Sequence, residues 1–78
     1  MHVIALCIDK LRESGLSFVD IAKRVDFSVG YVSNVRKGVA DPSCLFIMRL
    51  IAAVAERAAE VREMAAELEK LSKSNRSF

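Results

Sequence analysis

Residues 16–38, LSFVDIAKRVDFSVGYVSNVRKG, contain two short helical patterns separated by a tight turn. Ser17 and Ser28 each precede one pattern, where a hydroxyl can accept a hydrogen bond from a backbone amide of the first helical turn. Gly38 follows the second pattern, at a position where helices commonly stop. The apolar residues at helical spacing are Ile21, Ala22, Val25, Val32 and Val35. We therefore predict helices over residues 18–25 and 29–37.

The lengths of these two segments and the turn between them match a helix-turn-helix. Two helices that cross closely need a small side chain at the crossing, which Ala22 provides, and Phe27 adds an apolar group in the turn. The alternative is an arbitrary helical hairpin, which would satisfy fewer of these positions.

The flanking residues are also helical in pattern, so we predict an all-α fold. Upstream, an apolar stripe precedes a capping glycine, Gly15, and consists of Ile4, Cys7, Ile8 and Leu11. Downstream, Asp41 is placed to cap a helix that begins at Pro42. No glycine or proline occurs from residue 43 to residue 71, which predicts a nearly continuous helix. Its core residues are expected to be Ile47, Leu50, Ile51 and Val54.

A chain of 78 residues is long enough for one compact domain. We divide it into a domain over residues 1–55, a C-terminal helix over residues 56–72 and a flexible polar tail over residues 73–78. Two cysteines at apolar positions of separate helical patterns, Cys7 and Cys44, are expected to be buried and reduced. We expect neither a signal peptide nor a membrane span, and therefore a cytoplasmic protein.

Positive charge is concentrated in the first half of the chain. Residues 1–38 hold six basic and four acidic side chains, whereas residues 39–78 hold six of each. Four cations are opposed in this stretch only by Asp26, and they are Lys23, Arg24, Arg36 and Lys37. They form either a patch suited to phosphate or an ordinary solvated surface.

The residues offer little for catalysis or for metal binding. The single histidine, His2, follows the first residue, and no carboxylate pair has apolar neighbours that would raise its pKa. The row Glu56, Glu60, Glu63 and Glu67 has no histidine beside it and is interpreted as a solvated helix face. We expect no enzyme activity, no metal, no cofactor and no small-molecule substrate.

Residues 16–54 resemble the helix-turn-helix domains of the lambda repressor and Cro family. The resemblance is carried by LSFVDIAKRVDFSVGYVSNVRKG and by DPSCLFIMRLIAAV, residues 41–54, whose Pro-Ser pair is typical of the fourth helix of that family. It implies a bundle of five helices, or of four helices plus one long helix. It also implies sequence-specific binding of double-stranded DNA, dimerisation on a two-fold operator, and control of transcription of the phage repressor, Cro or restriction-controller kind.

The chain departs from that family at two positions. Asp26 occupies the turn position where the family usually has glycine, because the backbone there is left-handed, and an aspartate tolerates this conformation at a cost of about 1 kcal/mol. Phe18 replaces a glutamine that many members use to hold a phosphate. Ser17 or Lys23 is expected to substitute for it.

The resemblance makes residues 29–37 the recognition helix in the major groove. Its base-reading positions correspond to Val29, Gly30, Ser33 and Asn34. Asn34 suits an adenine edge, Ser33 suits any base and Val29 suits a thymine methyl group. Gly30 either allows a close approach of the backbone or is a neutral residue in the first turn.

The DNA backbone is expected to be contacted by residues around this helix. Arg36 and Lys37 are the main candidates, with Lys23 and Arg24 as weaker ones, and the two capping serines, Ser17 and Ser28, add hydroxyls. Tyr31 either stacks or bonds to phosphate, or is a half-buried residue at the rim of the core.

A second apolar stripe continues beyond the domain. It follows a three-four spacing and consists of Ala58, Val61, Met64, Ala65, Leu68 and Leu71. We expect two chains to pair through it as a homodimer, with the recognition helices about one DNA turn, or roughly 34 Å, apart. Arg57 interrupts the heptads, which favours a four-helix arrangement over a long coiled coil. The alternative is that the stripe folds back on the first helix of its own chain.

A second class of function stays open at this point. The chain can instead be a helical protein-interaction module that uses the C-terminal stripe, or the DNA-targeting subunit of a transposition or toxin-antitoxin complex. Weak dependence of DNA binding on salt would favour this class.

Overall fold

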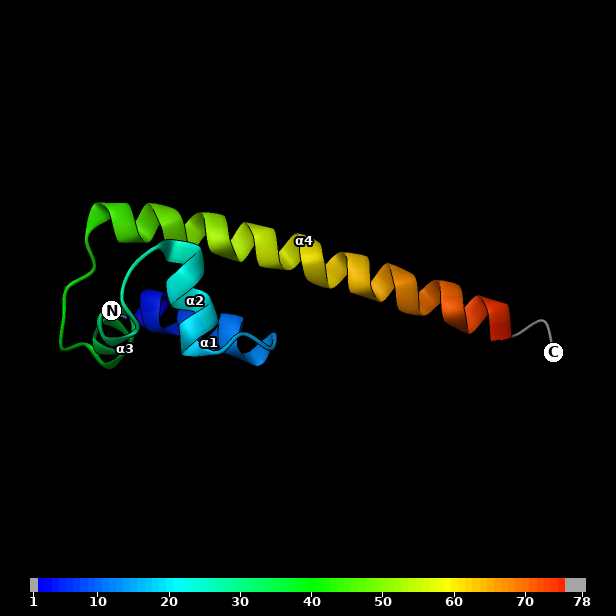
Figure 1. Cartoon of the computed structure of the whole chain (residues 1–78), viewed down its shortest axis with the longest axis horizontal. Coiled ribbons are helices and arrows are strands. Elements are labelled where there is room, and N and C mark those ends of the chain that lie inside the picture. Colours follow the sequence, from blue (N-terminus) through cyan, green and yellow to red (C-terminus); the bar gives the residue numbers. More distant parts are fainter. Residues whose placement is uncertain (1, 76–78) are drawn as a thin grey trace.

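The computed structural model describes residues 2–75, and within them the chain is all-α, as predicted. It contains four helices and no strand in this range: α1 (His2–Glu13), α2 (Phe18–Val25), α3 (Val29–Lys37) and α4 (Cys44–Asn75). Three short helices gather under the first half of one long helix, whose second half extends beyond them (Figure 1). The molecule is accordingly elongated, with extents of 55 × 20 × 18 Å.

Both predicted helices of the central stretch are confirmed at their bounds, and local caps explain why. The Ser17 hydroxyl accepts from the Asp20 amide at 3.2 Å, while the Asp20 carboxylate accepts from the Ser17 amide at 3.0 Å. This reciprocal pair is a capping box, which satisfies two amides at the start of α2. At α3 the Ser28 hydroxyl accepts from the Tyr31 amide at 3.1 Å.

The turn between α2 and α3 is left-handed at Asp26, as predicted. Its φ is 56° and its ψ is 49°, and its amide donates to the Ala22 carbonyl to close α2. Gly38 closes α3 in the same conformation, with φ 80°. The left-handed conformation costs free energy in a residue that has a side chain. At Asp26 it allows α2 to end and α3 to begin within a short turn.

One apolar core joins all four helices. Its fully buried large side chains come from each of them and are Ile8, Ile21, Val25, Val32, Val35 and Phe46. An aromatic cluster borders this core, because Phe27 stacks on Tyr31 at 4.9 Å and both rings meet Phe46 edge to face. The inward positions predicted for α2 and α3 are thereby confirmed.

The predicted start of the long helix was wrong. It begins at Cys44 instead of Pro42, and Ser43, not Asp41, provides the cap, because the Ser43 hydroxyl accepts from the Phe46 amide at 3.1 Å. The Asp41 carbonyl is instead bonded to the Tyr31 hydroxyl. The connector is held to α3, which delays the helix by two residues.

The buried face of α4 is rotated about the helix axis from the face that was predicted. Of the four expected residues only Leu50 is buried, whereas Ile51 is 65% exposed and Val54 is 37% exposed. The buried positions are Phe46, Leu50 and Ala53. Their spacing of four and three residues defines a single helix face, which the three short helices cover.

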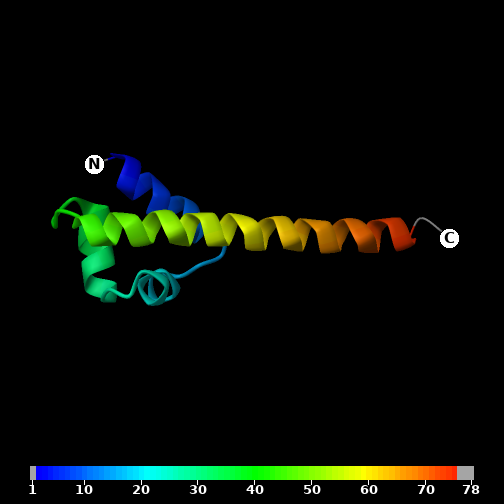
Figure 2. The ribbon, with the colours of Figure 1, turned by 90° about the horizontal axis from the view of Figure 1, so that it is seen from above.

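The long helix is continuous through the expected boundary at residue 55 and through the start of the expected tail. Residues 73–75 of the expected tail belong to α4, and residues 76–78 lie outside the described residues. In the described range the helix neither breaks into two nor folds back on α1 (Figures 1 and 2). Five separate helices are therefore not observed.

Candidate nucleic-acid interface

The outer face of α3 gathers the residues that were predicted to read bases. At 3.6 residues per turn, the inward Val32 and Val35 place Gly30, Asn34 and Lys37 on the opposite side. These three residues are exposed, and Ser33 beside them is half-buried. Val29 stands at the N-terminal edge, 40% exposed. The four predicted base-reading residues thus lie on one accessible surface.

This face carries no acidic side chain. The α3 sequence VGYVSNVRK contains neither aspartate nor glutamate, and its last turn contains Arg36 and Lys37. A surface of small polar residues flanked by cations is suited to an anionic polymer, because nothing on it repels phosphate.

Gly30 is not required by the fold. A Cβ added at this position would meet no atom within 4 Å, and the residue lies in the first turn of α3 without a positive φ. Since alanine is favoured over glycine in a helix, the glycine weakens α3 without helping it pack. Open space in front of the backbone is compatible with the close approach that the sequence suggested.

The expected phosphate patch is smaller than the sequence indicated. Arg36 donates through Nε and Nη2 to both carboxylate oxygens of Asp9 on α1, at 3.0 and 3.2 Å. The prediction that Asp26 alone opposes these cations was therefore wrong. Lys23 and Lys37 are both exposed, and neither forms an ion pair with a residue in the described range.

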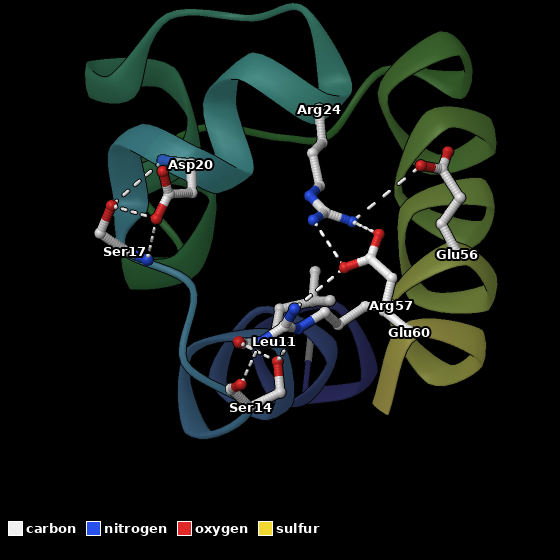
Figure 3. Close-up of polar contacts among 8 residues, drawn as sticks. All are labelled: Leu11, Ser14, Ser17, Asp20, Arg24, Glu56, Arg57 and Glu60. Carbon is white, nitrogen blue, oxygen red and sulfur yellow. Dashed lines mark hydrogen bonds and ion pairs between the residues drawn. The ribbon is translucent and has the colours of Figure 1, made fainter. Parts of the chain in front are cut away.

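Arg24 belongs to a network that holds α4 against the domain. It donates through two nitrogens to both oxygens of Glu60, each at 2.9 Å, and its Nη1 lies 4.0 Å from Glu56 (Figure 3). Arg57 donates to Glu60 at 2.9 Å, to the Ser14 hydroxyl at 3.0 Å and to the Ser14 carbonyl. The hydrogen bonds from these two arginines lower the pKa of Glu60 to about 2. Arg24 thus joins α2 to α4, and a phosphate would have to compete with Glu60 for its guanidinium.

Tyr31 is a half-buried rim residue. Its hydroxyl donates to the Asp41 carbonyl at 3.2 Å and accepts from the Ser43 amide at 3.0 Å, while its ring packs in the aromatic cluster. The hydroxyl thereby joins α3 to the start of α4. Of the two interpretations of this residue, the structure supports the rim, and a phosphate contact would compete with both bonds.

The two capping serines are similarly engaged. The Ser17 hydroxyl also donates to the Asp20 carboxylate, at 3.0 Å. Bonds from the Ser17 amide and hydroxyl lower the pKa of Asp20, so a negative charge already sits at the start of α2. A phosphate near Ser17 would meet this charge, whereas Ser28 has no such neighbour in its first turn.

Arg12 is a cation that the sequence reasoning missed. Its guanidinium lies over the Phe18 ring, 4.4 Å from the centroid, at the start of α2. The position where the family resemblance places a phosphate-holding glutamine therefore has an exposed arginine beside an aromatic ring. No local pattern connects the two residues, because they belong to different helices.

The six residues expected to form the dimer surface are all exposed. In particular, Met64 is 47% exposed and Leu68 is 66% exposed, because α4 has passed beyond the other helices at this point (Figure 1). Of the two cysteines, Cys7 is half-buried and Cys44 is exposed, so the expected burial of Cys44 was wrong.

Comparison of the chain with models of protein families, with curated proteins and with solved structures found no match. The resemblance to the lambda repressor and Cro family thus stays a prediction from the sequence. No helix within residues 2–75 is long and apolar enough to cross a membrane.

Proposed function

We propose that this protein binds double-stranded DNA in a sequence-specific manner as a homodimer and regulates transcription, with α3 in the major groove. The observation that carries the proposal is the exposed, acid-free outer face of α3, next to a second helix with which it forms a helix-turn-helix. The width of the major groove suits a single α-helix.

Recognition on this surface would divide between bases and phosphates. Asn34 is suited to two hydrogen bonds with an adenine edge, Ser33 to one bond with any base and Val29 to contact with a thymine methyl group. Gly30 allows the α3 backbone to approach the base edges. Lys23 and Lys37, which form no ion pair within residues 2–75, would neutralise phosphates, with Arg12 beside the start of α2 as a third cation.

Selection from a library of random duplexes tests the proposal. We expect one sequence to be enriched, and we expect Asn34→Ala to weaken binding to it by about 10-fold or more, since a good bidentate base contact contributes about 1–3 kcal/mol. Lys73→Ala is the control, because Lys73 is exposed and lies on the far half of α4, away from α3. Failure to enrich any sequence, together with unchanged DNA affinity of Asn34→Ala, would contradict specific binding.

A second candidate function is supported by α4. Its C-terminal half exposes an apolar stripe within the described residues, which is a feature of surfaces that bind other proteins. The chain would then be an interaction module or the DNA-targeting subunit of a transposition or toxin-antitoxin complex. Measured duplex affinity that hardly changes with salt would favour this candidate, because a regulator that neutralises phosphates loses affinity steeply as salt rises.

A further inference from the structure

An apolar groove runs between α1 and α4. Its volume is about 460 Å³, and its walls include Leu6 and Lys10 of α1 and Val54, Ala58 and Val61 of α4. In Figure 2, α1 lies on one side of α4 and α2 lies on the other, and the groove is lined by residues of α1 and α4 with Ser14. The adjacent Ile51 is 65% exposed, and Leu6 is 56% exposed. This part of the domain presents an apolar surface that no described residue covers.

The C-terminal half of α4 projects from the domain, in contrast to the concave groove. It is a projecting helix with an apolar stripe, and no short helix lies beneath it (Figure 1). The stripe residues Val61, Met64, Leu68 and Leu71 are 40–66% exposed. One chain thus has both an uncovered groove and an uncovered ridge. In a two-fold dimer, the ridge of each copy can occupy the groove of its partner.

Six apolar residues of α4 are spaced symmetrically about Val61. Toward the N-terminus they lie 3, 7 and 10 positions away and are Ala58, Val54 and Ile51. Toward the C-terminus they again lie 3, 7 and 10 positions away and are Met64, Leu68 and Leu71. Two antiparallel copies that cross at Val61 would therefore bring each of these six residues opposite another, whereas the remaining stripe residue, Ala65, would lie opposite Arg57.

The residue sizes also favour the antiparallel orientation. Ala58 would lie opposite Met64 of the partner, and Val54 opposite Leu68, so a small or medium side chain meets a larger one. In a parallel pair each residue meets its own copy, and Ala58 against Ala58 would leave a gap. Interiors pack best when large and small side chains alternate across the interface, because unfilled space costs free energy.

Charge supports the same arrangement. The groove lining includes Lys10, Arg57 and Arg62 and no carboxylate among the described residues. The surface around Met64 includes Glu60, Glu63 and Glu67, with Arg57 and Lys70. In the antiparallel pair the Met64 region of one copy lies along the α1 wall of the other, where Lys10 can meet Glu67, since Glu60 is already bonded to Arg24 and Arg57 of its own chain.

We propose that two copies of the chain pair through α4 in antiparallel orientation about Val61, with the C-terminal half of each α4 in the α1–α4 groove of its partner. The pair forms a four-helix arrangement from two α1 and two α4 helices. This inference deepens the homodimer part of the proposed function and rests on that part alone, since nothing in it requires DNA.

Sedimentation of the full chain is the first test. We expect a dimer, and we expect Leu68→Lys to give a monomer, because the added cation would be buried in a groove whose lining already includes Lys10, Arg57 and Arg62. Ala66→Lys is the matched control, since it adds the same charge at an exposed position two residues away, on the other side of α4. Circular dichroism checks that both variants keep their helices. A monomeric parent chain, or a dimer that Leu68→Lys leaves intact, would overturn the proposal.

Disulfide formation determines the orientation. In a background with Cys7→Ala and Cys44→Ser, we expect chains with Ile51→Cys to form a disulfide-linked dimer with chains carrying Leu71→Cys. Neither variant should link to itself, because the two copies of each position lie far apart in the antiparallel pair. Self-linked dimers of either variant would establish a parallel pair and overturn the proposal.

Binding of the enriched duplex is measured on the same variants. A dimer that binds no duplex would contradict the DNA-binding function and leave the pairing supported. A monomer that binds the duplex would contradict the pairing and leave the DNA-binding function supported. The two failures are therefore distinguishable.

Discussion

The Arg36 guanidinium on α3 is held by the Asp9 carboxylate on α1 through two hydrogen bonds, from Nε at 3.0 Å and from Nη2 at 3.2 Å. The hydrogen bonds to Asp9 raise the pKa of Arg36, so the guanidinium stays protonated and forms an ion pair with the Asp9 carboxylate. The end of the proposed recognition helix is thereby tied to the first helix of the chain. A phosphate would have to compete with Asp9 for this cation.

Asp9→Asn removes the negative charge that competes with phosphate for Arg36, although the amide oxygen can still accept one hydrogen bond. We expect tighter binding to duplex DNA and a salt dependence steeper by about 0.9 in log K against log salt, which corresponds to one more phosphate neutralised. Fluorescence anisotropy of a labelled duplex over a range of salt concentrations measures both quantities. Asp41→Asn is the control, because it removes the same charge from an exposed residue outside this pair. An unchanged slope in Asp9→Asn would show that Arg36 does not reach phosphate.

Gly30→Ala should separate folding from binding. We expect the free energy of unfolding to rise by about 0.5–1 kcal/mol, since the added methyl group meets open space and alanine is the better helix former. We also expect weaker duplex binding, because the same methyl group would stand between the α3 backbone and the bases. Urea denaturation and anisotropy measure the two effects. A variant that is more stable and binds DNA as well as the parent chain would refute the close approach at Gly30.

Gly38→Ala is the contrasting variant for that experiment. Its Cβ would also meet no atom within 4 Å, but the backbone φ there is +80°. We expect a loss of about 1–2 kcal/mol in the free energy of unfolding, the cost of a left-handed conformation in a residue with a side chain. Space is available at both glycines, so the opposite signs would come from the backbone conformation alone.

Tyr31→Phe tests the assignment of Tyr31 to the rim of the core. The ring would stay in the aromatic cluster, while the bonds to the Asp41 carbonyl and the Ser43 amide would be lost. We expect the free energy of unfolding to fall by about 0.5–1.5 kcal/mol for each of the two lost hydrogen bonds. Duplex affinity under folding conditions should stay the same. A drop in affinity with no change in stability would instead establish the hydroxyl as a phosphate contact.

Low pH should destabilise the folded chain, because protonation of Glu60 weakens its bonds to Arg24 and Arg57. The pKa of Glu60 is lowered from 4.5 to about 2 in the folded chain, so the unfolded chain binds more protons between these values. The stabilisation is therefore complete above about pH 4.5 and is lost progressively as the pH falls toward 2. Asp20, whose pKa is also lowered, contributes at the lower end of this range.

Glu60→Gln isolates this contribution. Urea midpoints measured between pH 7 and pH 2 should fall less steeply below pH 4.5 in the variant than in the parent chain, and the variant should be less stable at neutral pH. Glu63→Gln is the control, because it removes a glutamate from the same helix that forms no ion pair in the described range. Parallel curves for the parent chain and Glu60→Gln would rule out the Glu60 network as the acid-sensitive element.

Features that depend on residues close together in the sequence were predicted correctly, whereas features that depend on residues far apart in the sequence were not. The bounds of α2 and α3 were predicted correctly from the residues themselves, whereas the left-handed Asp26 was expected from the family resemblance alone. The two helix starts depend on residues three positions apart, Ser17 with Asp20 and Ser28 with Tyr31. Local capping and apolar spacing were sufficient there, because the interacting groups share one helical turn.

The features that needed the tertiary structure depend on distant partners. Arg36 and Asp9 are 27 residues apart, and Arg24 and Glu60 are 36 residues apart, so charge counting could not tell which cations are neutralised. The buried face of α4 likewise depends on how three other helices pack beneath it, and Ile51 and Phe46 are equally apolar in sequence. Local propensities determined which segments are helices, whereas the packing of those helices determined which side chains stay free to bind.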